Sequence, residues 1–179
     1  MTQVGINYAG GLYALAADEG LCVQLLQEMD ALEQAFAAEP DFLRLLAAPN
    51  IDKRERCQTV DDLFRGKVHP YMLNFLKLLT EKGYARYFDD CCQVFRQLYD
   101  RDNGILRVSA VTAVPLNQQQ SEKMTEKLSA ITGKTVMLTN TVEPACLGGV
   151  RLRYDGVQVD DTIRNRLMSV ESLLKNTQL

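Results

Sequence analysis

This sequence is poor in the residue types that most metal and redox sites need. It contains no tryptophan, and His69 is its single histidine among 179 residues. The five cysteines are odd in number and irregularly spaced, unlike a disulfide framework or a zinc site. Cys91 and Cys92 are adjacent, so on a helix their side chains would diverge by about 100° and could not easily clamp one metal. We therefore expect no metal site, core packing for this pair, and a reducing compartment.

Basic residues and long apolar runs are missing where targeting segments would need them. The first lysine or arginine is Arg44, so we predict neither a secretory signal nor a mitochondrial transit peptide. Residues 1–17 are uncharged, but polar residues and glycines interrupt them, and a membrane span needs ~20 mostly apolar residues. The net charge of −3 disfavours nucleic-acid binding. A soluble intracellular chain is expected, with no membrane insertion and no nucleic-acid partner.

The short motifs that carry catalysis or phosphate binding are also absent from the sequence. The glycine pairs at 10–11 and 148–149 lack the strand–loop–helix setting that cradles a phosphate. The acidic doublets at 61–62, 89–90 and 160–161 are interpreted as solvated faces and caps, because neighbouring side chains on a helix point apart. The sequence therefore predicts a protein that is not an enzyme, with no catalytic residue and no cofactor.

What the sequence does contain is an apolar repeat of helical period over its first 104 residues. Leu21, Leu25 and Met29 begin one such stripe, and proline or glycine punctuates the segments between stripes. Helices joined by turns this short predict an antiparallel six-helix bundle over residues 1–104. The expected helices cover residues 3–17, 21–36, 41–47, 53–64, 71–81 and 84–101.

From Ile105 the apolar period falls to two, which is typical of half-buried strands. Asn117 and Gln120 resemble a capping box at the start of a helix. Two further strands follow, then a short returning strand and a final helix, an order βαββ(β)α. Residues 105–179 are therefore predicted to form a small βαββα domain in which the bracketed strand is the short return. The fold class is α+β. The formal charge is −5 for residues 1–104 and +2 for the remainder, which suggests two different partners.

Two of the predicted helices carry more apolar surface than one core requires. On the helix over 71–81, Tyr71, Phe75 and Leu78 form a second apolar face beside the first, and the two together are wider than the roughly 100° stripe that faces one core. On the helix over 3–17, Gly11 lies mid-helix, where glycine costs ~1 kcal/mol relative to alanine. Close approach of another helix would explain it. The alternative is that both apolar faces are buried inside the bundle.

Several segments in order along the chain resemble one known family, the delta subunits of the F-type ATP synthase, whose mitochondrial relative is the oligomycin-sensitivity-conferring protein. The C-terminal part of the resemblance consists of Leu147-Gly148-Gly149-Val150, Asp155-Gly156, Val159-Asp160, Thr162-Ile163 and Leu167. The N-terminal part consists of Tyr8-Ala9 with Leu12 and Ala16, Phe42-Leu43 through Pro49 with Lys53, and Leu76 to Leu79 with Glu81 and Gly83.

This resemblance implies a non-catalytic stator on the cytoplasmic face of the bacterial cell membrane. In the family, the helical bundle binds the N-terminal helix of an alpha subunit between its first and fifth helices, and the C-terminal domain meets the b subunits of the peripheral stalk. Carried over by position, the groove candidates are Tyr8, Gly11, Leu12, Leu15, Tyr71, Phe75 and Leu78. The arginines that could steer an acidic stalk helix are Arg151, Arg153, Arg164 and Arg166.

A second interpretation follows from the C-terminal half alone. The order βαββα also resembles small-molecule regulatory modules of the ACT type. The chain would then be a ligand sensor with a helical output domain. A saturable shift in melting temperature on adding an amino acid or nucleotide would favour this alternative.

Overall fold

The computed structural model describes residues 2–48, 50–146, 148–154 and 156–160, and its fold class is α+β, as predicted. The chain divides into two compact units, Met1–Tyr99 and Asp100–Leu179. The division falls in the last helix of the first half, a few residues before Gly104, where the apolar period changes.

The helices of the first unit lie close to the predicted spans, with one correction. The helix predicted to begin at Tyr84 begins at Phe88, because residues Ala85–Tyr87 form a separate 3-10 turn (η1) in which Tyr87 N–H donates to the Tyr84 carbonyl at 2.9 Å. The α-helices of this half are α1 (Gln3–Asp18), α2 (Cys22–Ala38), α3 (Pro40–Ala47), α4 (Lys53–Phe64), α5 (Pro70–Glu81) and α6 (Phe88–Asp102).

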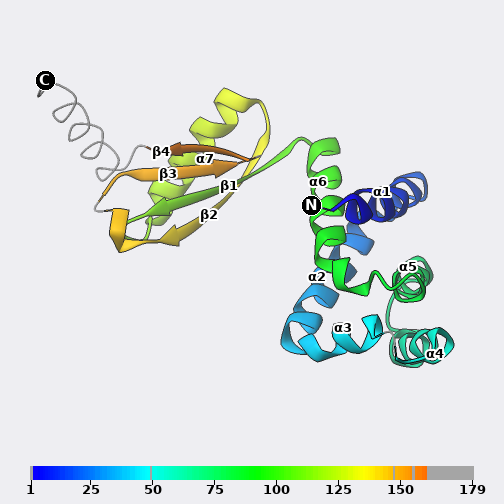
Figure 1. Ribbon diagram of the computed structural model, residues 1–179. Coiled ribbons are helices and arrows are strands. Elements are labelled where there is room, and N and C mark those ends of the chain that lie inside the picture. Colours follow the sequence, from blue (N-terminus) through cyan, green and yellow to red (C-terminus); the bar gives the residue numbers. More distant parts are fainter. Residues whose placement is uncertain (1, 49, 147, 155, 161–179) are drawn as a thin grey trace, which may run out of the picture. The chain divides into compact units, whose positions relative to one another are not determined.

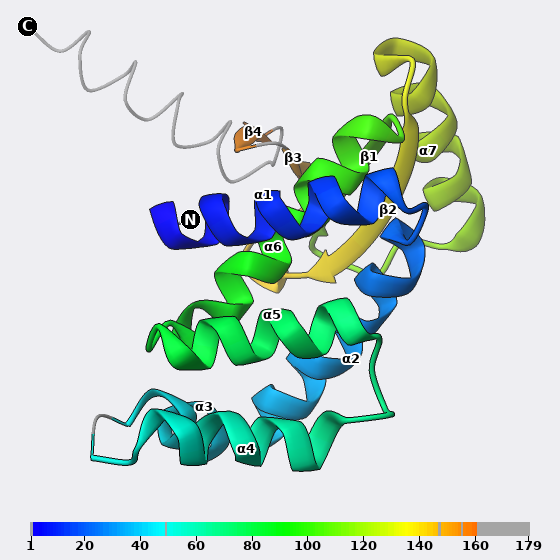
Figure 2. The ribbon, with the colours of Figure 1, turned by 90° about the vertical axis from the view of Figure 1, so that its right-hand side faces the viewer.

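In the first unit, α1, α5 and α4 lie on one side, with α5 between the other two (Figures 1 and 2). Helices α2 and α6 cross behind them at a steep angle in the view of Figure 2. In the same view α1 and α5 run in opposite directions. The N-terminal half of α1 is thus placed near the C-terminal end of α5, and the ring of Tyr8 contacts the edge of the Tyr84 ring at a centroid distance of 5.7 Å.

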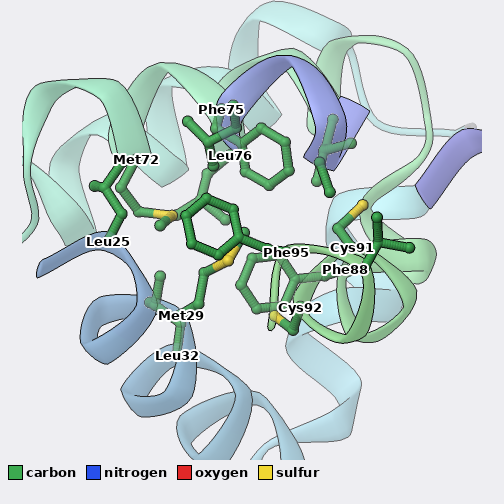
Figure 3. Packing of buried hydrophobic residues seen from close by; sticks show 14 of the residues in the cluster. Leu25, Met29, Leu32, Met72, Phe75, Leu76, Phe88, Cys91, Cys92 and Phe95 are labelled. Carbon is green, nitrogen blue, oxygen red and sulfur yellow. The ribbon is translucent and has the colours of Figure 1, made fainter. Parts of the chain in front are cut away.

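The core of this unit is large and rich in aromatic residues (Figure 3). Phe36 lies edge-on to Phe88 at 5.0 Å, and Tyr13 lies edge-on to Phe95 at 5.2 Å between ring centroids. Cys91 and Cys92 are fully buried in the same cluster, which confirms that they pack in the core. Burial, followed by the nearby charge of Asp90, raises the pKa of Cys91 to about 12. A thiol held protonated in this way is a poor nucleophile.

The second unit is built on a four-stranded sheet in the order β2-β1-β3-β4. Strands β1 and β2 are parallel and the other two pairs are antiparallel. A parallel pair needs a crossover connection, and α7 supplies it. The predicted capping box is confirmed: Gln120 N–H donates to Asn117 Oδ1 at 2.8 Å, and Asn117 N–H donates to Gln120 Oε1 at 3.0 Å. The elements are β1 (Ile105–Thr112), α7 (Gln118–Thr132), β2 (Thr135–Val142), the 3-10 turn η2 (Pro144–Cys146), β3 (Val150–Tyr154) and β4 (Val157–Asp160).

Helix α7 covers one face of this sheet (Figure 1). Leu128 of α7 packs against a small buried cluster of Leu106, Val108 and Val136. The opposite face presents the alternate residues of each strand, because side chains of a strand point to the two faces in turn. The predicted final helix, with Ile163, Leu167, Val170 and Leu174 as its stripe and Arg164 and Arg166 beside it, lies outside the described residues.

Candidate functional site: the surface of α1 and α5

The candidate site is the surface of α1 and α5, which we define by the seven predicted groove residues and call the α1–α5 surface. On α1, Leu12 is buried, with 7% of its surface exposed, and belongs to the core. Tyr8 is half-buried and packs against the same core. Leu15 is 40% exposed, and Gly11 is exposed as well. These positions follow the i, i+3/i+4, i+7 spacing of one helix flank.

On α5 the second apolar face is similarly divided between core and surface. Phe75 is 5% exposed and belongs to the core, whereas Leu78 is 40% exposed. Tyr71 is half-buried, and the centroid of its ring lies 4.9 Å from the centroid of the His69 ring. The α1–α5 surface therefore has buried members, Leu12 and Phe75, partly covered tyrosines, and open members, Gly11, Leu15 and Leu78. Neither full burial nor full exposure describes it.

Gly11 has open space around it. A Cβ built on this residue would meet no atom of the described chain within 4 Å. Close approach of helices within this chain thus does not explain the glycine. The glycine where such an approach occurs is Gly5, whose Cβ would lie 3.2 Å from the Asp90 carbonyl oxygen. The sequence pattern did not single out Gly5, although a small residue on the buried stripe of α1 was the available signal.

The position of α5 is fixed by a buried arginine that the sequence pattern missed. Arg56 of α4 is only 5% exposed, and its Nη1 donates to the Leu46 carbonyl at 2.6 Å and to the Thr80 carbonyl at 3.5 Å. These carbonyls lie in the last turns of α3 and α5, so one side chain ties three helices together. Arg56 precedes buried Val60 by four residues, which places it on the apolar stripe of α4 and was a usable signal.

Asp61, predicted to be solvated as part of an acidic doublet, is buried instead. Its carboxylate forms ion pairs with Lys77 of α5 and with Arg65. Hydrogen bonds from Lys77 and then Arg65 hold the pKa of this carboxyl below its ordinary value. Asp61 can be buried because the cations of Lys77 and Arg65 both contact its carboxylate, which therefore remains charged.

The start of α5 is held by the histidine. His69 occupies the N-cap position, and its Nδ1 accepts a hydrogen bond from the Tyr71 N–H at 3.3 Å. Its own backbone N–H donates to Glu28 Oε2 of α2 at 2.9 Å. The His69 side chain therefore caps the first turn of α5 at Tyr71.

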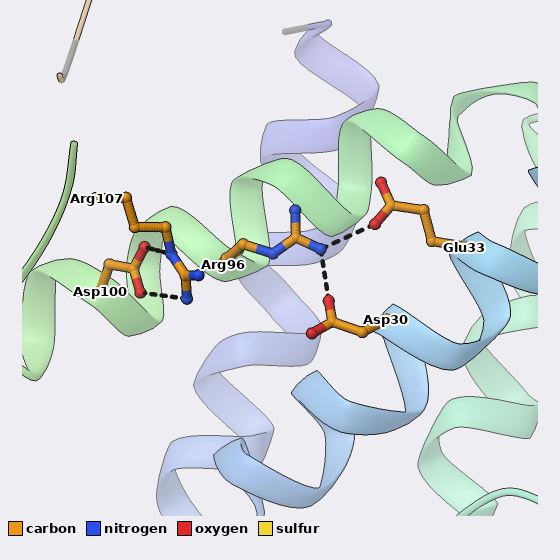
Figure 4. Close-up of polar contacts among 5 residues, drawn as sticks. All are labelled: Asp30, Glu33, Arg96, Asp100 and Arg107. Atoms are coloured by element: carbon orange, nitrogen blue, oxygen red, sulfur yellow. Dashed lines mark hydrogen bonds and ion pairs between the residues drawn. The ribbon is translucent and has the colours of Figure 1, made fainter. Parts of the chain in front are cut away.

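A charged network joins α2 to α6 on another part of the unit (Figure 4). Arg96 Nη2 donates to Asp30 at 2.5 Å and to Glu33 at 2.9 Å. On neighbouring Asp89, burial, then the charges of Glu33 and Asp90, raise the pKa. The charges of Arg96, Asp30 and Glu33 compensate one another, and the geometry is that of a structural tie between α2 and α6.

The groups described so far supply binding surface and no reaction chemistry. Over residues 2–48, 50–146, 148–154 and 156–160, no three histidine, cysteine or acidic side chains are placed to hold a metal ion. Within the same ranges no helix has the length and apolar character needed to cross a bilayer. The apolar side chains exposed beside buried ones suit recognition of another apolar surface.

Comparisons with known proteins agree on one family. The family model of the ATP synthase delta (OSCP) subunit matches residues 4–174. ATP synthase subunit delta of Alkaliphilus oremlandii is 31% identical, over 96% of this chain and 95% of that protein. ATP synthase subunit delta 2 of Syntrophotalea carbinolica is 30% identical over 98% of each. A chain of the cryo-EM structure of the Toxoplasma gondii mitochondrial ATP synthase hexamer has the same fold, with a TM-score of 0.76, 17% identity and coverage of 97% of this chain and 98% of that one.

Proposed function

This chain belongs to the ATP synthase delta (OSCP) subunit family, and from that premise we propose that its α1–α5 surface binds the N-terminal helix of an ATP synthase alpha subunit. The chain is a non-catalytic subunit of the F-type ATP synthase. It serves in the stator, which keeps the catalytic alpha/beta head from turning with the central rotor. The match over residues 4–174 favours this function over the ACT-type ligand sensor.

The observation that carries the proposal is that two adjacent, antiparallel helices each expose an apolar residue of the predicted groove, one toward each end of the α1–α5 surface. Leu15 of α1 and Leu78 of α5 are each 40% exposed, next to core residues Leu12 and Phe75. An amphipathic helix lying over such a surface would bury apolar anchors along its length. Gly11 leaves room for its backbone to approach α1 closely.

This mode of binding suits a mechanical role. A stator must remain attached under load, so its contacts need slow dissociation rather than rapid capture. Buried apolar anchors mainly slow dissociation, whereas exposed rim charges mainly change the association rate. We propose that the six helices of residues 1–104 act as one bundle that presents this attachment point.

The second unit is proposed to make the other attachment. Residues 105–179 would contact the b subunits of the peripheral stalk, and the assembled complex would place the chain on the cytoplasmic face of the bacterial cell membrane. The charge of +2 on this part of the chain supports an acidic partner segment.

The proposal is tested by titrating the full chain with a peptide from the N-terminus of the alpha subunit of the same organism. We expect Leu78→Asp and Leu15→Asp to weaken peptide binding at least about 100-fold, since each buries a charge in an apolar contact. Ile6→Asp is the matched control, because Ile6 is 47% exposed on α1 and lies two residues from Tyr8, on the opposite flank of the helix.

Circular dichroism and thermal melting would show whether each variant is folded. Equal loss of binding in all three variants would contradict the α1–α5 surface as the site. Unfolding of Leu78→Asp would likewise show that Leu78 is part of the core.

A further inference from the structure

The second unit has a cavity of about 400 Å³ on the sheet face opposite α7. A row of directly paired residues crosses all four strands at this point: Thr139 of β2, Ser109 of β1, Arg153 of β3 and Gln158 of β4. Arg107 lines the cavity too, from the same face of β1. The row thus carries one guanidinium group, two hydroxyl groups and an amide, and the guanidinium group of Arg107 lies outside it on the same sheet face.

The arginines on this sheet face differ in how their charges are compensated. Arg107 donates from Nε and Nη2 to the carboxylate of Asp100, at 2.5 and 3.0 Å (Figure 4). Arg151 donates to Asp160 at 2.8 Å and to Glu143 at 3.4 Å. Arg153 donates from Nε to the neutral amide oxygen of Gln158 at 2.9 Å. Within the described part of this unit, Arg153 has no carboxylate partner.

We infer that this cavity receives an acidic side chain from a segment of the peripheral stalk, with Arg153 as the group that binds its carboxylate. The inference rests on the proposed function and specifies the chemistry of its second contact. An arginine can bind a carboxylate through two parallel hydrogen bonds. Ser109 lies next to Arg153 in the row, and Thr139 follows one strand farther on.

A peptide segment fits this cavity better than a small metabolite does. Small-molecule sites bury most of their ligand and are lined mainly by apolar side chains. Here Arg107, Thr139, Arg153 and Gln158 are all exposed, so the cavity is open along the sheet. An open, positively charged surface instead guides an acidic partner to its position and raises its rate of association.

The test measures association of the full chain with the soluble domain of the b subunits of the same organism, at low and at high salt. Arg153→Glu should slow association at low salt at least about tenfold, and Arg153→Gln should slow it less. Lys127→Glu is the matched control, because it changes the net charge equally at an exposed position of α7, on the other side of the sheet. It should remain within about twofold of the wild type. The slowing by Arg153→Glu and by Arg153→Gln should be smaller at high salt.

The remaining outcomes separate this inference from the proposed function. Equal slowing by Arg153→Glu and Lys127→Glu would overturn the cavity as the site, leaving only a general charge effect. Wild-type chain that fails to bind the b domain would refute the stalk contact itself. Inorganic phosphate or succinate that raises the melting temperature of wild type but not of Arg153→Glu, with b binding unaffected by the substitution, would overturn the inference in favour of a small-anion site.

Discussion

The two units of this chain differ in the size of their cores and in the charge of the surfaces that they expose. Among the described residues, the helical unit has a continuous core of twenty buried apolar residues. The sheet unit has a buried cluster of three, beneath one covering helix. The helical part of the chain has a formal charge of −5 and exposes Leu15 and Leu78 on the α1–α5 surface. The sheet part has a charge of +2 and exposes Arg107 and Arg153 on one face of its sheet.

This difference suggests that a stator subunit can bind one partner through apolar contacts and another through charge. A unit with a large core remains folded even when leucines stay at its surface, so it can offer an apolar surface that holds a partner for long times. The sheet unit also leaves large apolar side chains exposed, among them Val114 and Ile131, so its contrast with the helical unit lies in the arginines on one sheet face. Such charge guides a partner to its position and is sensitive to salt.

The largest effect is expected from removing a core ring of the helical unit. Phe95 is fully buried and lies edge-on to Tyr13. Phe95→Ala should lower the free energy of unfolding by about 3–5 kcal/mol, because the lost apolar burial leaves a cavity. Leu106→Ala is the matched variant in the sheet unit, with an expected loss of about 2–3 kcal/mol. Urea denaturation monitored separately for helix content and for sheet signals would measure both.

If the two units are independent, each variant lowers only the transition of its own unit. A single shared transition that moves equally for both variants would contradict the division between the units.

A smaller loss is expected from the buried arginine that ties α3, α4 and α5 together. Arg56→Met keeps most of the volume but leaves the Leu46 and Thr80 carbonyls without this donor. The free energy of unfolding should fall by about 1–3 kcal/mol. Arg54→Met is the control, since Arg54 is exposed on the same helix. Equal stability of the two variants would show that Arg56 does not position α5.

Acid should weaken the same region through Asp61. Its pKa is below the ordinary value of 3.8 in the folded chain, so its contribution to stability is complete above that value and is lost as the pH falls through the folded pKa. Asp61→Asn should therefore be less stable than wild type at pH 7, and the difference should shrink between about pH 4 and pH 2. Thermal melting across this range measures it, and a difference that is constant with pH would contradict the ion pairs.

Much of the fold follows from periodicity, and its exceptions have physical causes. The apolar stripe from Leu21 to Phe36 predicted α2, because apolar residues that recur every three or four positions lie on one face of a helix and pack in the core. The start of α6 was misplaced because Tyr84 and Tyr87 continue the apolar pattern through a 3-10 turn. Pairing order is a different matter: strand periodicity predicts which face is buried but not that β1 lies between β2 and β3.

The candidate site was partly accessible to sequence reasoning. The excess apolar surface of two predicted helices identified α1 and α5. It did not separate buried Phe75 from exposed Leu78, because both lie on the second apolar face of α5 and only tertiary packing distinguishes them. Arg56 and Asp61 were missed because a charged residue is ordinarily assigned to the surface. Their burial depends on the carbonyls of Leu46 and Thr80 and on the cation of Lys77, which α3 and α5 supply.

The smallest stability effect offers the most direct test of the central claim, that the α1–α5 surface is shaped for another chain and not for the packing of this one. Gly11→Gln and Gly10→Gln both replace an open mid-helix glycine, so each should raise the free energy of unfolding by about 0.5–1 kcal/mol. Gly10 lies about 100° around the helix, away from the Tyr8 flank, and is the control. The measurement is the affinity of the full chain for the alpha N-terminal peptide. We expect at least tenfold weaker binding for Gly11→Gln alone, by about 1.4 kcal/mol. Equal binding by the two variants would contradict the α1–α5 surface as a site for another chain.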